Sequence, residues 1–153
     1  MGPVVQKKRL LAISSAGGHW EQLMLVSAAF DECEVVYAVT NPAVAERSGV
    51  VAEEIPDFNA KQPLKTLLGG LKIGRMVLRL KPDVVVSTGA APGLVAATVA
   101  KAIGAKTVWI DSVANANRLS LSGRLARHIA DLWLTQWEHL ATPDGPRYGG
   151  AVL

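Results

Sequence analysis

The stretch that decides the fold is RLLAISSAGGHWEQ, residues 9–22. Its first part, Arg9–Ser14, is an apolar run typical of a buried strand, and the apolar spacing from His19 to Phe30 predicts a helix. Gly17 and Gly18 stand between the two, where glycine lets the backbone turn tightly and approach a ligand closely. The stretch therefore predicts a strand, a glycine-rich turn and a helix, which is the first unit of an α/β fold.

Strand-like and helix-like segments continue to alternate along the chain. Further strands are expected at residues 33–40, 50–55, 84–87, 107–110 and 132–135. Further helices are expected to start at Asn41-Pro42 and to cover residues 63–80, 92–103 and 122–130. This alternation, with nearly continuous apolar strands, predicts a Rossmann-like, doubly wound parallel sheet. Ligands bind beyond the carboxyl ends of the strands in such sheets, so the loops at that edge carry the functional argument.

The composition describes a folded α/β protein with a substantial core. The 153 residues are 50% hydrophobic and 19% charged, which excludes intrinsic disorder, and we expect a single domain over residues 1–153. The single cysteine excludes an internal disulfide framework and a multi-cysteine zinc site, and it fits a reducing compartment. His19, His128 and His139 lack the spacing of metal ligands, so no metal is expected.

Charge and hydropathy argue against a nucleic-acid-binding protein and against a membrane-spanning one. The formal net charge of +3 is too weak to indicate a nucleic-acid partner. The longest uncharged stretch, residues 84–100, contains Gly89 and Pro92 and is shorter than the about 20 apolar residues that a membrane-spanning helix needs. The short apolar run of residues 10–13 is not a secretory signal.

The first edge loop is a candidate site for an anion and a base. Ser15, Gly17 and Gly18 precede a predicted helix, whose free N–H groups bind anions. His19 falls in its first turn, where the helix dipole disfavours the charged imidazole and leaves a neutral ring that can accept a proton. The alternative is a plain turn with His19 as a capping or solvent-facing residue. The loop has neither the G-x-G-x-x-G pattern of dinucleotide sites nor the Gly-Lys-Ser/Thr of a phosphate-binding loop.

The second edge loop, residues 87–93, joins a strand to a helix through small residues. Small side chains let a bulky ligand approach the backbone, and close packing of the helix on the sheet is the equally open alternative. The G-x-S-x-G pattern of a nucleophile elbow is missing, so hydrolase chemistry is not indicated. The candidate ligand-binding residues of this loop are Thr88, Gly89, Ala90, Pro92 and Gly93.

The third edge loop, residues 111–118, is dense in polar groups. Asp111, Ser112, Asn115 and Arg118 suit a hydroxyl-rich or phosphorylated ligand. The alternative is a solvated loop in which Asp111 caps a helix. Gln136 and Trp137 follow the last predicted strand, where the tryptophan is open to three interpretations: contact with a sugar, with a partner, or with the core.

The segment from Lys61 to Lys81 predicts an amphipathic helix. At helical spacing its basic residues form one stripe, namely Lys61, Lys65, Lys72, Arg75 and Arg79. Its apolar stripe consists of Leu64, Leu67, Leu71 and Leu78. This combination suits an interfacial helix on anionic lipid, and an ordinary helix with solvated lysines is the alternative. Gly69-Gly70 argues against a continuous helix.

Several motifs occur in an order that resembles a known family. They are Ser14-Ser15-Ala16-Gly17-Gly18-His19, Ser87-Thr88-Gly89-Ala90, Asp111-Ser112, Leu119-Ser120-Leu121-Ser122-Gly123, Ala130-Asp131, Gln136-Trp137 and Tyr148-x-Gly150. Over nearly its whole length the chain resembles the asparagine-linked-glycosylation fourteen family and its bacterial polysaccharide relatives. The resemblance implies the N-terminal half of a GT-B glycosyltransferase that is split between two polypeptides.

In that family this half is the membrane-associated, acceptor-side subunit. The resemblance implies a partner that binds the UDP-sugar, with the active site in the cleft between them and no cofactor beyond the sugar nucleotide. It implies transfer, with inversion, of a sugar such as N-acetylglucosamine or glucuronic acid to a polyprenyl-diphosphate-linked saccharide. His19 is then the candidate catalytic residue. The family usually has Glu in place of Asp111 and Arg near Asn115, and Arg118 is the basic residue available here.

The resemblance also implies a location and leaves alternatives. Eukaryotic relatives carry an N-terminal membrane helix without a counterpart here, so the Lys61–Lys81 segment is expected to meet the bilayer. The expected location is cytoplasmic, peripheral on the inner face of the plasma membrane. The alternative functions are a non-catalytic scaffold that anchors a partner glycosyltransferase, and a self-sufficient small-molecule α/β enzyme.

Overall fold

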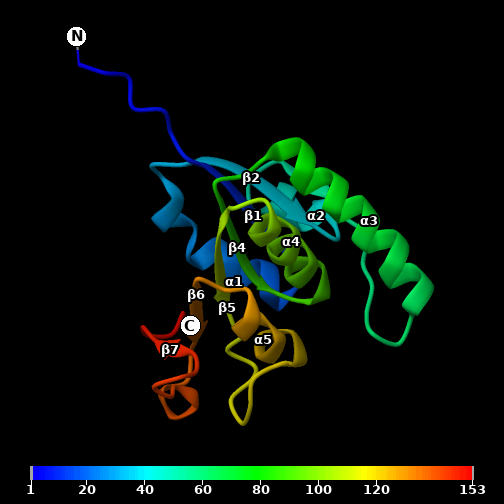
Figure 1. Cartoon of the computed structure of the whole chain (residues 1–153), viewed down its shortest axis with the longest axis vertical. Coiled ribbons are helices and arrows are strands. Elements are labelled where there is room, and N and C mark those ends of the chain that lie inside the picture. The colour runs from blue at the N-terminus through cyan, green and yellow to red at the C-terminus, as the bar shows by residue number, and fades with distance from the viewer. Residues whose placement is uncertain (1, 153) are drawn as a thin grey trace.

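The structure, a computed structural model, describes residues 2–152 and is built on one seven-stranded parallel sheet in the order β3-β2-β1-β4-β5-β6-β7 (Figure 1). The strands are β1 (Arg9–Ser14), β2 (Glu34–Val39), β3 (Ala52–Glu54), β4 (Val84–Gly89), β5 (Lys106–Ile110), β6 (Leu132–Thr135) and β7 (Arg147–Tyr148). The helices are α1 (Gly18–Leu25), α2 (Pro42–Arg47), α3 (Pro63–Leu80), α4 (Ala91–Ala102) and α5 (Leu121–Leu125). The predicted doubly wound α/β class is confirmed.

Helices cover both faces of the sheet, because the central strands bury side chains on both sides. On β1, Leu11 and Ile13 point into a core shared with α3 and α4, while Leu10 and Ala12 point into a second core shared with α1 and α2. All four side chains are at most 4% exposed. Two cores therefore hold the carboxyl ends of the central strands in fixed places.

The glycine-rich loops after β1 and β4 meet in the middle of the sheet. The chain goes from β1 outward to β2 and β3, then crosses over to β4 on the other side of β1. In the strand register Ser14 stands opposite Gly89, and the N–H of Ser15 donates to the carbonyl oxygen of Gly89 at 3.0 Å. This reversal of strand order opens the crevice in which doubly wound folds bind ligands.

Two local signals in the sequence are confirmed. The Asn41 side chain accepts a hydrogen bond from the N–H of Ala43 at 3.1 Å and caps α2, with Pro42 as its first residue. Gly104 follows α4 with a φ of +89°, in the left-handed region that ends many helices.

The helix predicted from His19 to Phe30 is shorter than expected. α1 ends at Leu25, and Ser27–Phe30 forms a separate 3₁₀ turn. The Ser27 hydroxyl donates to the carbonyl oxygen of Met24 at 2.7 Å, so a side chain takes a bond that continued helix would give to a backbone N–H.

The C-terminal third also differs in detail from the prediction. The helix expected over residues 122–130 is α5 followed by a 3₁₀ turn at Ala126–His128. The Ser120 hydroxyl oxygen caps α5 by accepting from the N–H of Gly123 at 2.8 Å. β7 was not predicted, because a two-residue strand is too short to show alternation.

α3 is one continuous helix from Pro63 to Leu80, despite its paired glycines. Gly69 lies against the ring of Phe58, while Gly70 and Gly74 face Val95 and Val99 of α4. The glycines therefore allow close packing on both sides, and the predicted helix over residues 63–80 is confirmed although paired glycines weaken a helix. No helix within residues 2–152 is long and apolar enough to cross a membrane.

Candidate active site

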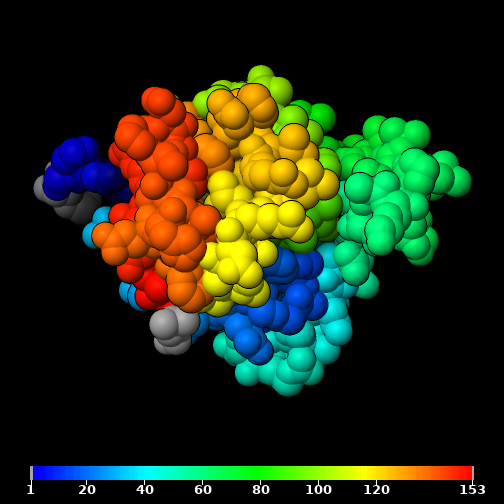
Figure 2. Space-filling view, turned by 90° about the horizontal axis from the view of Figure 1, so that it is seen from below, coloured from blue at the N-terminus to red at the C-terminus, as the bar shows by residue number. Residues whose placement is uncertain are grey.

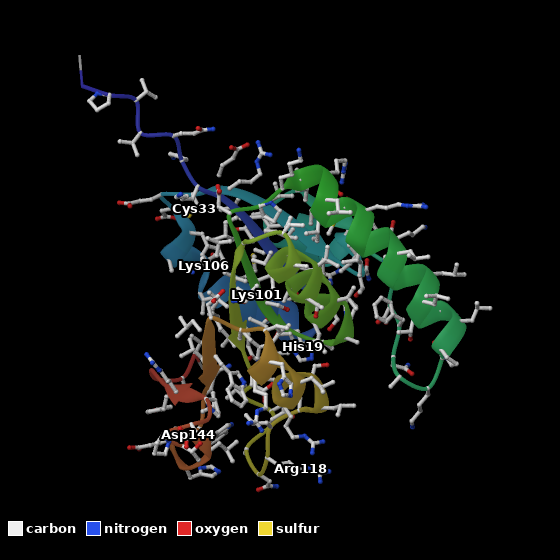
Figure 3. The ribbon with its side chains drawn as sticks, viewed as in Figure 1. His19, Cys33, Lys101, Lys106, Arg118 and Asp144 are labelled. Carbon is white, nitrogen blue, oxygen red and sulfur yellow. The ribbon has the colours of Figure 1, made fainter. Side chains whose placement is uncertain are left out.

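His19 is held at the carboxyl edge of the sheet by two hydrogen bonds to one residue of β4. Its Nδ1 atom lies 2.8 Å from the carbonyl oxygen of Thr88, and the Thr88 hydroxyl donates to the carbonyl oxygen of His19 at 2.6 Å. Figure 3 shows the imidazole at this end of the sheet, near the start of α4. His19, the predicted base, therefore lies in the first turn of α1 and is tied by these two bonds to the end of β4.

The imidazole ring rests against Gly89, and only glycine leaves it room. A Cβ built on Gly89 would lie 2.6 Å from Cε1 and 2.7 Å from Nδ1 of His19. Gly89 also has a φ of +125°, which side-chain-bearing residues rarely adopt. The sequence prediction that Gly89 gives a ligand access to the backbone needs revision, because the group it admits is His19.

The start of α1 leaves its N–H groups open. Gly17 has a φ of +81°, Gly17 and Gly18 are exposed, and no side chain caps the helix. Ser15 and Ala90 are half-buried beside it. The free N–H groups of Gly18 and His19, together with the positive end of the helix dipole, suit an anionic ligand.

The start of α4 is less available than the sequence suggested. Pro92 and Gly93 are buried in its first turn. A Cβ on Gly93 would collide with the Ser87 side chain, so this glycine serves close packing of α4 on the sheet. The packing alternative holds for Pro92 and Gly93, and their predicted contact with a ligand is not supported.

A groove of about 420 Å³ opens beside His19, between α1 and the loop that follows β5. Its walls include Gly18, His19, Glu21, Gln22, Leu25, Ser112, Val113, Ala114 and Val152. Figure 2 looks at this edge and shows the blue start of the chain's first helix lying against the yellow loop of residues 111–120. The first and third predicted loops are therefore brought together.

Gln22 joins these two walls, and the sequence analysis did not single it out. Its side chain is 6% exposed and donates to the Ser112 hydroxyl at 3.1 Å. Its oxygen accepts from the N–H of Val113 at 3.2 Å and from the Gln136 side chain at 2.6 Å. A signal was present, because Gln22 lies three residues after His19 and so shares its face of α1.

Asp111 organises the third loop from within. It is 2% exposed, and its carboxylate accepts from the Ser120 hydroxyl at 2.6 Å, the Ser120 N–H at 3.1 Å and the Asn115 side chain at 3.3 Å. The indole N–H of Trp109 lies 3.3 Å from the same group. Asp111 is thus buried rather than solvated, and it holds Ser120, the residue that caps α5, instead of capping a helix itself; its contact with a ligand stays a prediction.

The remaining predicted residues divide between loop support and exposure. Gln136 is 4% exposed and donates to the carbonyl oxygen of Asp111 at 3.0 Å. The Trp137 indole donates to the carbonyl oxygen of Val113 at 2.7 Å. Both brace the third loop, whereas Arg118 is exposed at its outer end (Figure 3) and has no ion pair within residues 2–152.

A second feature is the outer side of α3, which projects beyond the body of the molecule at the right of Figure 2. We call the following residues the α3 surface: Leu64, Leu67, Leu68 and Leu71, which are 52–69% exposed, with Lys65, Lys72 and Arg75. Of the other two predicted basic residues, Lys61 lies before the start of α3, and Arg79 is exposed but pairs with Glu53 at 2.6 Å. A further hollow of about 590 Å³ runs beside the helix, lined partly by Leu68, Leu71 and Pro56.

Within the part of the chain that the structure describes, no three His, Cys, Asp or Glu side chains come together as a cation site. The groove instead combines an imidazole, open amides and buried amide side chains. Such a set can take a proton from a hydroxyl group and hold an anion beside it.

The fold and this edge define a Rossmann-like domain that resembles one half of a GT-B glycosyltransferase. The sequence profile of the family described as "Oligosaccharide biosynthesis protein Alg14 like" matches residues 52–151. The chain belongs to the Alg14 family, as the motifs predicted.

Known proteins similar to this chain agree with that assignment. The UDP-N-acetylglucosamine transferase subunit ALG14 of Mus musculus is 37% identical over 71 residues, which cover 42% of this chain and 33% of the mouse protein. MurG of Acinetobacter baumannii superposes with a TM-score of 0.76 at 14% identity, over 92% of this chain and 45% of MurG. The UDP-GlcNAc 2-epimerase of Methanocaldococcus jannaschii gives a TM-score of 0.64 at 17% identity, over 83% of this chain and 39% of the epimerase. The chain thus spans a third to less than half of these proteins.

Proposed function

We propose that this chain is the acceptor-binding subunit of a two-component UDP-sugar glycosyltransferase. The observation that carries the proposal is His19, fixed by Thr88 against Gly89 at the reversal point of the sheet, beside the uncapped start of α1. The name of the mouse relative, a UDP-N-acetylglucosamine transferase subunit, favours N-acetylglucosamine as the sugar, with glucuronic acid as the second candidate.

The chemistry requires a base and a diphosphate site. His19 takes the proton from the acceptor hydroxyl as its oxygen bonds to the anomeric carbon. The bond from that carbon to UDP breaks on the opposite side, so the configuration inverts and UDP leaves with the electron pair. The open amides of Gly18 and His19 suit the diphosphate of a polyprenyl-linked saccharide.

The second wall of the cleft belongs, in this proposal, to a UDP-sugar-binding partner. The groove beside His19 is open on the side of the carboxyl edge, and the mouse relative is itself called a subunit. The sugar nucleotide is then a co-substrate bound mainly by the partner, and no further cofactor takes part. Arg118 is exposed at the outer end of the third loop, on the side that such a partner would face, while Asn115 supports this loop through its bond to Asp111.

The α3 surface supports a peripheral place on the inner face of the plasma membrane. Exposed leucines beside Lys65, Lys72 and Arg75 suit an anionic lipid surface. α3 starts at the edge of the sheet that carries His19, so a membrane contact there would bring a lipid-linked acceptor close to the groove.

The decisive experiment uses the complex isolated from membranes through a tag on this chain. The complex, UDP-[¹⁴C]GlcNAc and a polyprenyl-diphosphate-linked saccharide should yield labelled lipid and UDP, and this chain alone should yield neither. His19→Ala should lower turnover by about 10²–10⁴-fold while recovery of the complex stays the same. Normal turnover by this variant would remove His19 from the mechanism.

A non-catalytic membrane scaffold is the second candidate, favoured by the α3 surface alone. It predicts that substitutions in the groove leave turnover intact, while charge reversal on α3 releases the partner from the membrane. Turnover by the isolated chain would instead support a self-sufficient enzyme.

A further inference from the structure

We propose that Thr88 is a positioning residue that fixes the tautomer of His19, so that Nε2 is the nitrogen that accepts the proton. This inference rests on the proposed function, because it names the atom through which His19 acts. It adds a residue whose side chain, 0% exposed, lies beneath the groove rather than in it.

The two ring nitrogens of His19 have different surroundings. A carbonyl oxygen only accepts hydrogen bonds, so the contact of 2.8 Å between Nδ1 and the Thr88 carbonyl oxygen requires the proton to be on Nδ1. A neutral imidazole with a proton on Nδ1 has its lone pair on Nε2. The backbone of β4 therefore selects the tautomer.

Three contacts hold the imidazole in the orientation that selects this tautomer. The Thr88 hydroxyl donates to the carbonyl oxygen of His19 at 2.6 Å, so the two residues exchange hydrogen bonds in both directions. One bond fixes the ring and the other fixes the backbone of α1 to β4. The ring also lies against Gly89, which removes space for another orientation.

The second ring nitrogen of His19, Nε2, is left without a partner in the part of the chain that the structure describes. Within residues 2–152 this atom has no hydrogen-bond partner, and His19 lines the groove of about 420 Å³. The lone pair is thus available to an acceptor hydroxyl at the place where the proposed function needs it. Loss of the Thr88 hydroxyl would release the backbone of α1 that aims the ring, so that Nδ1 would meet the Thr88 carbonyl oxygen only part of the time and both tautomers would be populated.

The test combines spectroscopy on the full chain with kinetics on the complex. The protein is labelled with ¹⁵N-histidine and kept at about pH 8.5, two units above the usual pKa of an imidazole. Long-range ¹H–¹⁵N spectra then distinguish the two tautomers. His19→Ala assigns the signal among the three histidines. Wild type and Thr88→Ser should show Nδ1–H, and Thr88→Val a mixture of both tautomers. In the complex, Thr88→Val should lower kcat by about 10–100-fold with little change in KM.

Thr98→Val is the matched control, because the Thr98 hydroxyl makes a comparable bond of 2.8 Å to the carbonyl oxygen of Leu94, away from His19. It should leave the tautomer and kcat unchanged. An Nε2–H signal in wild type would overturn the inference even if Thr88→Val failed to fold. A wild-type Nδ1–H signal with full activity of His19→Ala would instead leave the tautomer assignment standing and overturn the proposed base.

Discussion

Gly69 and Gly70 are neighbours in α3, yet one added methyl group should have opposite effects at the two positions. A Cβ on Gly69 would lie 2.5 Å from Cδ1 of the Phe58 ring, which is itself 4% exposed, whereas a Cβ on Gly70 would make an ordinary contact of 3.8 Å with Val95. Gly69→Ala should therefore lower the free energy of unfolding by about 1–3 kcal/mol through overpacking. Gly70→Ala should raise it by about 0.5–1 kcal/mol, because alanine favours helix. Urea unfolding of both variants checks the pair, and equal shifts would contradict it.

At the scale of single residues, the sequence predicted which loops come together better than the contacts that each side chain makes. The position of His19 at the carboxyl edge could be predicted because it follows a strand and paired glycines. The roles of Asp111 and Gly93 could not, because both depend on side-chain contacts with a neighbouring element or loop, with Ser120 and Ser87 respectively. Gln22 was missed because its buried bond joins it to Gln136, which lies 114 residues further along the chain.

At the scale of elements, α3 offers the clearest test of membrane contact. Each basic residue near an anionic surface contributes about 1 kcal/mol, so Lys65→Glu, Lys72→Glu and Arg75→Glu together should weaken vesicle binding by at least about 100-fold. The measurement is co-sedimentation with vesicles of which about one third of the lipid is phosphatidylglycerol.

The control for α3 reverses the same number of charges elsewhere. Lys7, Lys8 and Lys106 are exposed near the amino ends of β1 and β5, at the opposite edge of the sheet from the groove. Charge reversal at these three lysines should change binding far less. Equal loss in both triple variants would show that net charge, rather than the α3 surface, holds the protein to lipid.

Elements with long periodic patterns were predicted well, and elements shaped by local side-chain bonds were not. The apolar runs of β1, β2, β4 and β6 and the stripe of α3 are present at nearly the expected residues. The end of α1 at Leu25 is accompanied by a hydrogen bond from the Ser27 hydroxyl to the Met24 carbonyl oxygen, and β7 is defined by its pairing with β6. Neither interaction leaves a periodic signal in the sequence.

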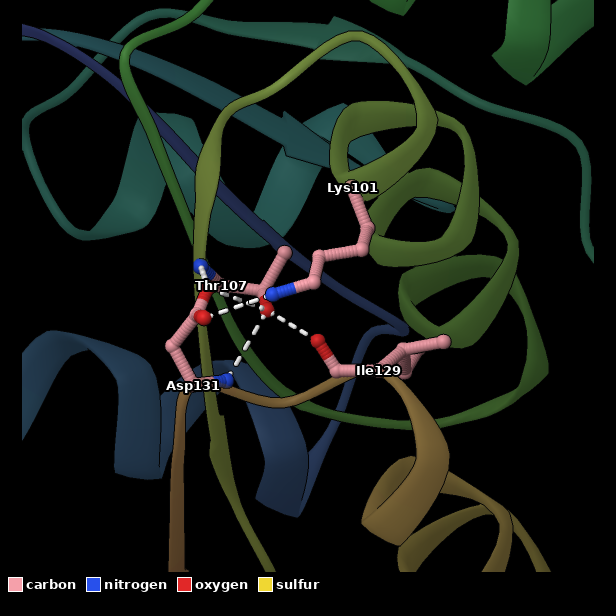
Figure 4. Close-up of polar contacts among 4 residues, drawn as sticks. All are labelled: Lys101, Thr107, Ile129 and Asp131. Carbon is pink, nitrogen blue, oxygen red and sulfur yellow. Dashed lines mark hydrogen bonds and ion pairs between the residues drawn. The ribbon is translucent and has the colours of Figure 1, made fainter.

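At the scale of the whole molecule, a polar cluster joins α4 to β5 and to the residue that precedes β6 (Figure 4). The Lys101 ammonium group lies 2.6 Å from one Asp131 oxygen, and the N–H of Thr107 donates to the other at 2.9 Å. The Thr107 hydroxyl in turn donates to the carbonyl oxygen of Ile129. The hydrogen bonds from Lys101 and Thr107 hold the pKa of Asp131 below its usual value.

This lowered pKa predicts how stability depends on pH. The folded state favours the charged form of Asp131. Its contribution to the free energy of unfolding is therefore fully present above about pH 4, which is the usual pKa of aspartate. The contribution is lost as the pH falls through the lower pKa of the folded state. In urea unfolding, the difference between wild type and Asp131→Asn should be largest near neutral pH and shrink below about pH 4. Glu53→Gln, which breaks the surface pair with Arg79, should cost less than about 1 kcal/mol. A difference for Asp131→Asn that is independent of pH would contradict the assignment.

The sheet ends on both sides in very short strands, with three residues in β3 and two in β7. Long exposed border strands invite pairing with another chain, and brief ones offer few free backbone groups for it. Association by extending the sheet is therefore disfavoured for this protein. Loops and helix surfaces then remain as the parts of the molecule that another chain can contact.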